Sequence, residues 1–191
     1  MSIKVPVGVS NRHVHLSQED LETLFGKGAT LTVKKDLSQP GQFAASEIVS
    51  LVGPKGSISS VRVLGPFRSH TQIEISRTDA FSLGIDPPVR ESGDLDGAAT
   101  ITLVGPAGAV QVTEGAIIAM RHIHMTPREA AFWGLHDKCL VQVEISGLRG
   151  VILKNTVVSV REDFCLEMHV DTDEANAAFL RNGDFVEVLT S

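Results

Sequence analysis

Two short segments of the chain place a pair of histidines two residues apart. The segments read RHVHLSQED at residues 12–20 and RHIHMTPRE at residues 121–129. In extended chain, alternate side chains lie on one face, so His13 and His15 point to the same side, and so do His122 and His124. Because imidazole nitrogens are common ligands of transition metals, each pair could hold one ion.

A second similarity between the two halves adds two further candidate ligands. IEISRTDA at 73–80 resembles MHVDTDEA at 168–175, and this alignment places Glu74 opposite His169. The six candidate ligands are His13, His15, Glu74, His122, His124 and His169. Such an imidazole-rich set suits Zn²⁺, with Co²⁺, Fe²⁺ and Ni²⁺ as close alternatives, and six ligands could serve two ions. His70 and His136 have no counterpart in the other half, so we expect structural roles for them.

Arg68 and Ser92 could bind an anion near these ligands. Arg68 lies six residues before Glu74 and therefore on the same face if the strand is regular. Its guanidinium could hold an oxyanion beside the metal. Ser92, next to Gly93, could offer a hydroxyl and a backbone N–H. Arg12 and Arg121 precede the two histidine pairs, and their repetition indicates support of the ligands or of the turn.

The elements that must position these residues are mostly short strands bounded by glycine. Representative segments are EIVSLVG, SVRVLG, TQIEIS, ATITLVG, LVQVEIS and DFVEVL. They predict a mostly β protein with short α-helices, built as two duplicated small antiparallel β-barrel modules. Helices are predicted after each histidine pair, capped by Ser17 and Thr126, and in DEANAAFL after Asp171 or Thr172.

The two modules are expected at residues 1–95 and 96–191. The turn-rich and acidic stretch ESGDLDG at 91–97 marks the boundary, although interleaved halves would blur it. The offset between matched segments falls from 109 residues for the histidine pairs to 95 for the later segments, so the first half carries 14 extra residues between them. We therefore expect an insertion in the first half, in KKDLSQPGQFAA at 34–45.

Composition excludes several classes of protein. With 191 residues the chain is shorter than the roughly 250 residues of a TIM barrel. A net charge of −6 with intermixed signs argues against a nucleic-acid groove. Two cysteines form no disulfide framework, the start MSIKVPVGVS lacks the apolar run of a signal peptide, and no stretch reaches the ~20 apolar residues of a membrane helix. We expect a cytoplasmic protein.

Several segments together resemble the PduL-type phosphate propanoyltransferases, the phosphotransacylases of propanediol utilisation. They are VGVSNRHVHLS (7–17), LSQPGQFAA (37–45), VRVLGPFRSHTQIEISRTDA (61–80), RESGDLDG (90–97), RHIHMTP (121–127) and EMHVDTDEANAA (167–178). The resemblance implies a duplicated β-barrel enzyme with two metal ions, usually zinc, that exchanges coenzyme A and phosphate on a short acyl group. Members targeted to microcompartments carry an amphipathic N-terminal extension, whereas six residues precede VGVSNRH here.

The resemblance also implies roles for individual residues. One metal would be bound by Glu74, His122, His124 and His169, and the other by His13 and His15 with a share from His124. Arg68 matches the family's phosphate-contacting arginine, and Ser92 matches a residue that lines the coenzyme A region.

The expected reaction converts acyl-CoA and inorganic phosphate into acyl phosphate and coenzyme A, with propanoyl or acetyl as the acyl group. Phosphate clamped by Arg68 would attack the thioester carbonyl directly. We expect no acyl-enzyme, because Cys139 and Cys165 have no repeat counterpart and Cys165 reads as a small buried hydrophobe. Two alternatives stay open, a dinuclear hydrolase of esters or phosphates and a metal-stabilised binding module without activity. We also expect a homo-oligomer.

Overall fold

The computed structural model describes residues 3–189, which divide into two compact units, each with its own core of buried aliphatic side chains. The N-terminal barrel is formed by Arg12–Ala119. The C-terminal barrel combines the chain up to Asn11 with the chain from Met120 onward. The predicted mostly β class with two barrel modules is confirmed.

Six strands close the N-terminal barrel in the order β4-β5-β2-β6-β9-β8. Their bounds are β2 His13–His15, β4 Phe43–Val52, β5 Ser57–Gly65, β6 Gln72–Glu74, β8 Ala99–Val104 and β9 Ala109–Ala119. Two further strands lie outside this ring, β3 (Val33–Asp36) on β4 and β7 (Val89–Arg90) on β9. Strand β3 and the turn after it fall in the stretch where the sequence predicts an insertion.

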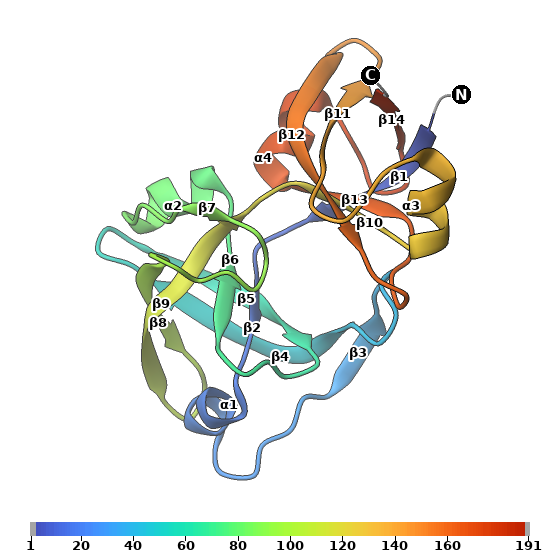
Figure 1. Ribbon diagram of the computed structural model, residues 1–191. Helices are drawn as coiled ribbons and strands as arrows, with labels where there is room; N and C mark the ends of the chain where they lie inside the picture. The colour runs from blue at the N-terminus through green and yellow to red at the C-terminus, as the bar shows by residue number, and fades with distance from the viewer. Residues whose placement is uncertain (1–2, 190–191) are drawn as a thin grey trace. The chain divides into compact units, whose positions relative to one another are not determined.

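Six strands also close the C-terminal barrel, in the order β1-β13-β10-β12-β11-β14. Their bounds are β1 Ile3–Ser10, β10 His122–Met125, β11 Leu140–Ile145, β12 Val151–Val160, β13 Glu167–Asp171 and β14 Phe185–Leu189. The blue strand β1 therefore lies among orange and red strands in Figure 1, paired with β13 and β14. In β11 the alternation of valine or isoleucine with polar residues matches an alternation of buried and exposed positions.

The two barrels share one pattern of strand pairing. In each, the strand with the His-x-His pair is parallel to one neighbour and antiparallel to the strand that carries the third predicted ligand. Each barrel also has a second parallel pair, β1 with β13 in the C-terminal barrel and β6 with β9 in the N-terminal barrel. In the chain, β1 directly precedes the histidine strand β2 of the N-terminal barrel, and β9 directly precedes the histidine strand β10 of the C-terminal barrel. Each barrel is therefore mixed, with four antiparallel and two parallel strand pairings, whereas the sequence patterns suggested antiparallel pairing throughout.

The expected modules 1–95 and 96–191 differ from the units in the structure. Strands β8 and β9 complete the N-terminal barrel, whereas β1 completes the C-terminal one. The physical reason is closure, because a barrel removes its exposed edges only when a last strand pairs on both sides. The acidic stretch 91–97 is a loop between β7 and β8, inside the N-terminal barrel.

Four short helices are present in residues 3–189, and three match the sequence predictions. Helix α1 (Gln18–Phe25) begins after Ser17, α3 (Pro127–Trp133) after Thr126, and α4 (Thr172–Ala178) after Asp171. Helix α2 (Arg77–Leu83) was not predicted, although Ser76 and Asp79 form a reciprocal capping box at its start. No helix in this part of the chain has the length and apolar character needed to cross a membrane.

Candidate metal centres

Strands β2 and β6 bring together three predicted ligands in the N-terminal barrel. His13 lies directly opposite Glu74 in the antiparallel ladder, and His15 follows two residues along β2. All three side chains are buried, and each offers a ligand atom within 4.8 Å of the others. His13 Nε2 is 3.4 Å from Glu74 Oε2. Because metal–ligand bonds to nitrogen and oxygen are about 2 Å long, small rotations of these side chains would bring three such atoms onto one ion.

Strands β10 and β13 build the matching cluster in the C-terminal barrel. His122 lies opposite His169, at the register position that His13 and Glu74 occupy in the other barrel. The three histidines His122, His124 and His169 again offer ligand atoms within 4.8 Å of one another. Their ring centroids are 4.6–5.0 Å apart. The predicted set thus falls into two clusters of three, one in each barrel.

The electrostatic surroundings favour the protonation states that bind metal. Burial, reinforced by His13, lowers the pKa of His15 well below its ordinary value. Burial also lowers the pKa of His124 to about 3, with help from His122 and His169. For Glu74, burial acts to raise the pKa, but His13, with help from His15 and Ser92, outweighs it and holds the pKa well below its usual range. At neutral pH, His15 and His124 are therefore neutral and Glu74 is ionised.

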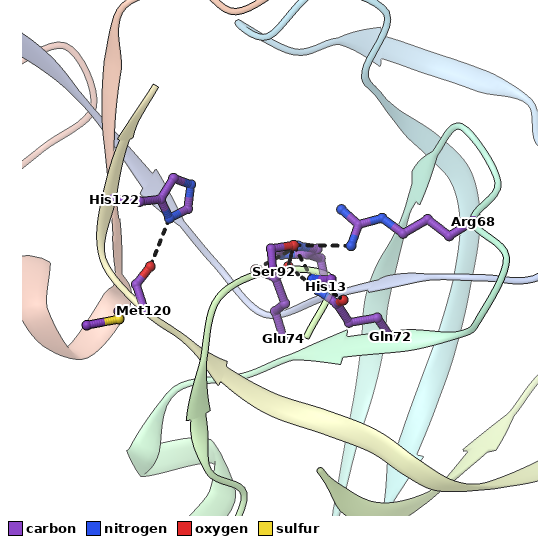
Figure 2. A network of polar contacts seen from close by, with 8 residues as sticks. His13, Arg68, Gln72, Glu74, Ser92, Met120 and His122 are labelled. Atoms are coloured by element: carbon purple, nitrogen blue, oxygen red, sulfur yellow. Dashed lines mark hydrogen bonds and ion pairs between the residues drawn. The ribbon is translucent and has the colours of Figure 1, made fainter. Parts of the chain in front are cut away.

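The hydrogen bonds of the histidines fit a divalent metal. Within residues 3–189, the Nδ1 atoms of His15 and His124 are buried with no hydrogen-bond partner, and these residues occupy matched positions in the repeat. A buried polar atom without a partner is costly, and a bound cation would satisfy it. His122 Nδ1 donates to the Met120 carbonyl at 2.8 Å, which leaves the lone pair on Nε2 for a metal (Figure 2).

Arg68 and Ser92 lie beside the cluster of the N-terminal barrel. Arg68 Nη1 donates to Ser92 Oγ at 3.1 Å, and Ser92 Oγ donates to Glu74 Oε1 at 2.8 Å, as Figure 2 shows. Gln72 Nε2 also donates to Glu74 Oε1, at 2.6 Å. Burial lowers the pKa of Arg68, although Glu74 opposes the change. A partly desolvated cation of this kind is suited to an anionic ligand.

Arg68 lies close to the Glu74 cluster, but the predicted reason for its position, a regular strand, is wrong. It assumes a regular strand from Arg68 to Glu74, whereas residues 66–71 form a loop between β5 and β6. The loop is fixed by a hydrogen bond from the Arg68 backbone N–H to the Leu16 carbonyl, 3.1 Å long. Strand β2, which ends at His15, therefore determines where the arginine lies.

Arg12 and Arg121 join each histidine pair to the helix that follows the third ligand. Arg12 donates to both carboxylate oxygens of Asp79, from Nε to Oδ2 at 2.8 Å and from Nη2 to Oδ1 at 2.7 Å. Arg121 Nε binds Glu174 Oε1, and its Nη1 donates to the Lys154 carbonyl. Asp79 and Glu174 are the N3 residues of the capping boxes of α2 and α4. The predicted supporting role thus has a concrete form, because each arginine ties two ligand-bearing segments together.

Sequence reasoning missed the residues that lie opposite the second histidine of each pair. Gln72 is opposite His15, and Glu167 is opposite His124. Glu167 Oε2 lies 2.6 Å from His169 Nε2. The alignment that matches Glu74 with His169 also matches Gln72 with Glu167, so the signal was present in the repeat.

The remaining histidines and cysteines lie outside both clusters. His70 and His136 are exposed. Cys139 is partly buried and packs against the core of the C-terminal barrel. The expectation that Cys165 is buried is wrong, because it lies exposed in the turn before β13 rather than in the strand.

Comparison with known proteins gives one consistent result. Residues 6–181 match the family model described as phosphate propanoyltransferase. Curated proteins named phosphate propanoyltransferase include one from Thermotoga maritima that is 60% identical over 184 residues, 96% of this chain and 88% of the relative. Another, from Rhodobacter capsulatus, is 54% identical over 96% of this chain and 86% of the relative. A third, from Salmonella typhimurium, is 52% identical over 91% of this chain and 83% of the relative.

Proposed function

The chain belongs to the phosphate propanoyltransferase family and is an acyltransferase, and from that premise we propose that it transfers a short acyl group between coenzyme A and inorganic phosphate at a metal-dependent site. The observation that carries the metal part of the proposal is the matched pair of clusters, each with two imidazoles two residues apart and a third ligand directly opposite. The acyl group proposed is propanoyl or acetyl.

Arg68 is proposed to bind the phosphate that accepts the acyl group. A guanidinium can make two parallel hydrogen bonds to a tetrahedral oxyanion, which fixes its orientation as well as its charge. The Ser92 hydroxyl contacts both Arg68 and Glu74, so it lies where phosphate and a ligand of the metal would meet. Its expected contact with coenzyme A remains part of the proposal, since the thioester must reach the same place for transfer.

Each cluster is proposed to hold one Zn²⁺, with Co²⁺, Fe²⁺ or Ni²⁺ as substitutes. This proposal follows the two clusters and departs from the assignment that the resemblance implies, which placed Glu74 with His122, His124 and His169 and gave His13 and His15 a share of His124. Here one ion would be held by His13, His15 and Glu74, and the other by His122, His124 and His169. When bound, a divalent ion supplies Lewis-acid charge that stabilises the oxyanion or thiolate developing during acyl transfer. The protein holds His15 and His124 neutral and Glu74 ionised at neutral pH, so no proton has to leave these three groups before an ion binds.

The transfer is proposed to be direct. Arg68 would hold one phosphate oxygen free to attack the thioester carbonyl, so the carbon–sulfur bond breaks as the carbon–oxygen bond forms and coenzyme A leaves as thiolate. Orientation of the bound phosphate contributes most where the nucleophile is weak. Cys139 packs in the core and Cys165 lies in an exposed turn, so neither is favoured as a covalent carrier.

The test is an assay of coenzyme A release from propanoyl-CoA, with a thiol reagent, in the presence and absence of phosphate. Release that requires phosphate, together with acyl phosphate trapped by hydroxylamine, supports the proposal. Release without phosphate would identify a hydrolase instead, and no release by protein with bound metal would identify a binding module. His15→Ala and His124→Ala then address whether both centres serve one reaction: each should abolish turnover, whereas independent centres would each leave about half.

Three further expectations belong to this proposal and are open to simple measurements. Metal analysis of purified protein should find two zinc ions per chain. Light scattering after size-exclusion chromatography should give a mass above 20.5 kDa, as expected for a homo-oligomer. Cell fractionation should place the protein in the cytoplasm.

A further inference from the structure

The carboxylate of Glu167 is directed at the third ligand of the C-terminal cluster. Glu167 begins β13, opposite His124 in the ladder with β10, and its Oε2 lies 2.6 Å from His169 Nε2. Both side chains are largely buried, with 15% of Glu167 and 22% of His169 exposed. Because a carboxylate accepts, Nε2 carries the proton when the imidazole is neutral. The lone pair of His169 is then on Nδ1.

In the N-terminal barrel the donor and acceptor are exchanged, because the residue beside the third ligand donates a hydrogen bond instead of accepting one. There Gln72 takes the place of Glu167, and its amide Nε2 donates to Glu74 at 2.6 Å. Each barrel thus pairs its third ligand with a neighbour of complementary character. A carboxylate ligand has an amide donor beside it, and an imidazole ligand has a carboxylate acceptor. A purely structural role for Glu167 gives no reason for this match.

Gly8 leaves the space that Glu167 occupies. Gly8 lies on β1, opposite His169 in the parallel ladder with β13. A Cβ atom at Gly8 would lie 2.9 Å from Glu167 Cδ, 3.1 Å from Oε1 and 3.2 Å from Oε2. Because the carboxylate is the end of a flexible side chain, a methyl group there would push the carboxylate away at little cost to the fold. Strand β1 therefore permits the contact between Glu167 and His169.

We infer that Glu167 is a positioning residue for the metal centre of the C-terminal barrel, accepting a hydrogen bond from His169 Nε2–H, and that Gly8 provides the space for it. The inference rests on the proposed metal centre of the same barrel. Carboxylates that accept from metal-binding histidines fix the tautomer and orientation of the ring, and their loss typically lowers metal affinity 10- to 100-fold.

The experiment measures Zn²⁺ affinity by competition with a chromophoric chelator. His13→Ala is introduced in every protein, so that the C-terminal centre is the one measured. Glu167→Ala should weaken binding about 10- to 100-fold. Glu167→Gln should lose less, since its amide oxygen can still accept. Gly8→Ala should weaken binding in the same direction, because it displaces the carboxylate.

A double variant distinguishes this role from a general effect on the barrel. Gly8→Ala acts through Glu167, so adding it to Glu167→Ala should have no further effect on Zn²⁺ affinity. Circular dichroism checks that each variant is folded, and Glu167→Gln and Gly8→Ala serve if Glu167→Ala is not. Unchanged affinity in folded Glu167→Ala, or in Gly8→Ala where Glu167→Ala does not fold, would overturn the inference, and so would additive effects in the double variant. If the parent protein itself bound no Zn²⁺, the proposed metal centre would fail as well, which is a distinguishable result.

Discussion

Replacing Arg12 with glutamine should destabilise the N-terminal barrel and weaken Zn²⁺ binding at its proposed metal centre. The side chain binds both oxygens of Asp79, at 2.7 and 2.8 Å, and Asp79 is only 5% exposed. Asp79 in turn accepts a hydrogen bond from the Ser76 N–H at the start of α2. Arg12 directly precedes His13, and α2 begins three residues after Glu74. The ion pair therefore links the segments that carry these two ligands.

The expected loss follows from the burial of the two partners. Breaking a fully buried ion pair typically costs about 3–5 kcal/mol, because a charge remains without its partner. Exposed pairs contribute about 0–1 kcal/mol. Arg12 is 34% exposed whereas Asp79 is buried, so the pair lies between these cases. We expect the free energy of unfolding to fall by about 2 kcal/mol, a factor of roughly 30 in the folding equilibrium.

Urea unfolding followed by far-UV circular dichroism measures the change. Arg77→Gln is the matched control, because Arg77 begins the same helix and pairs with Asp86 while the two side chains are 65% and 85% exposed. That control should lose less than about 0.5 kcal/mol. Zn²⁺ affinity of the N-terminal centre should fall in Arg12→Gln and not in the control. Equal unfolding curves for the two variants would refute the reasoning.

Three further predictions concern the reaction. His124→Ala should remove one metal ion per chain and lower kcat by orders of magnitude, whereas His136→Ala, outside both clusters, should retain activity; similar losses in metal analysis and rate assays would contradict the assignment. Arg68→Lys keeps the charge but loses the bidentate guanidinium, so KM for phosphate should rise about 10-fold or more while KM for propanoyl-CoA changes little; the reverse pattern in steady-state kinetics would move Arg68 to the coenzyme A site. Cys165→Ala should keep its turnover, and double-reciprocal plots at varied propanoyl-CoA and phosphate should intersect, whereas parallel lines and an inactive variant would indicate an acyl-cysteine.

Acidification supplies a prediction for the metal-free protein, grounded in His124. Its pKa of about 3 lies below the ordinary 6.5, so the unfolded chain binds more protons between these values. The contribution of His124 to stability is therefore complete above about pH 6.5 and is lost as the pH falls toward 3. His124→Ala should flatten the dependence of urea unfolding on pH across this window, and an unchanged slope would speak against it.

Local patterns in the sequence were sufficient to select the six side chains that the structure groups into two candidate metal centres. The two-residue period of a strand places His13 and His15 on one face, and the repeat supplies Glu74 and His169 as matched third ligands. Helix starts were equally readable where a capping residue precedes a helical segment, as at Ser17 and Thr126. These features depend on residues within a few positions of one another, or on a comparison of one half of the chain with the other.

Only the tertiary structure determined which strands close each barrel and which groups surround the ligands. Strand β1 joins β13, more than 150 residues away, and β9 joins β6. Nothing local to either strand fixes that choice, because pairing partners are selected by closure of the whole barrel. The contact of Glu167 with His169 in the space left by Gly8, and the loop that brings Arg68 to Ser92, arise from the same long-range pairing. The type and spacing of side chains can be read from the sequence, whereas the contacts between strands depend on which distant strands pair in the folded barrel.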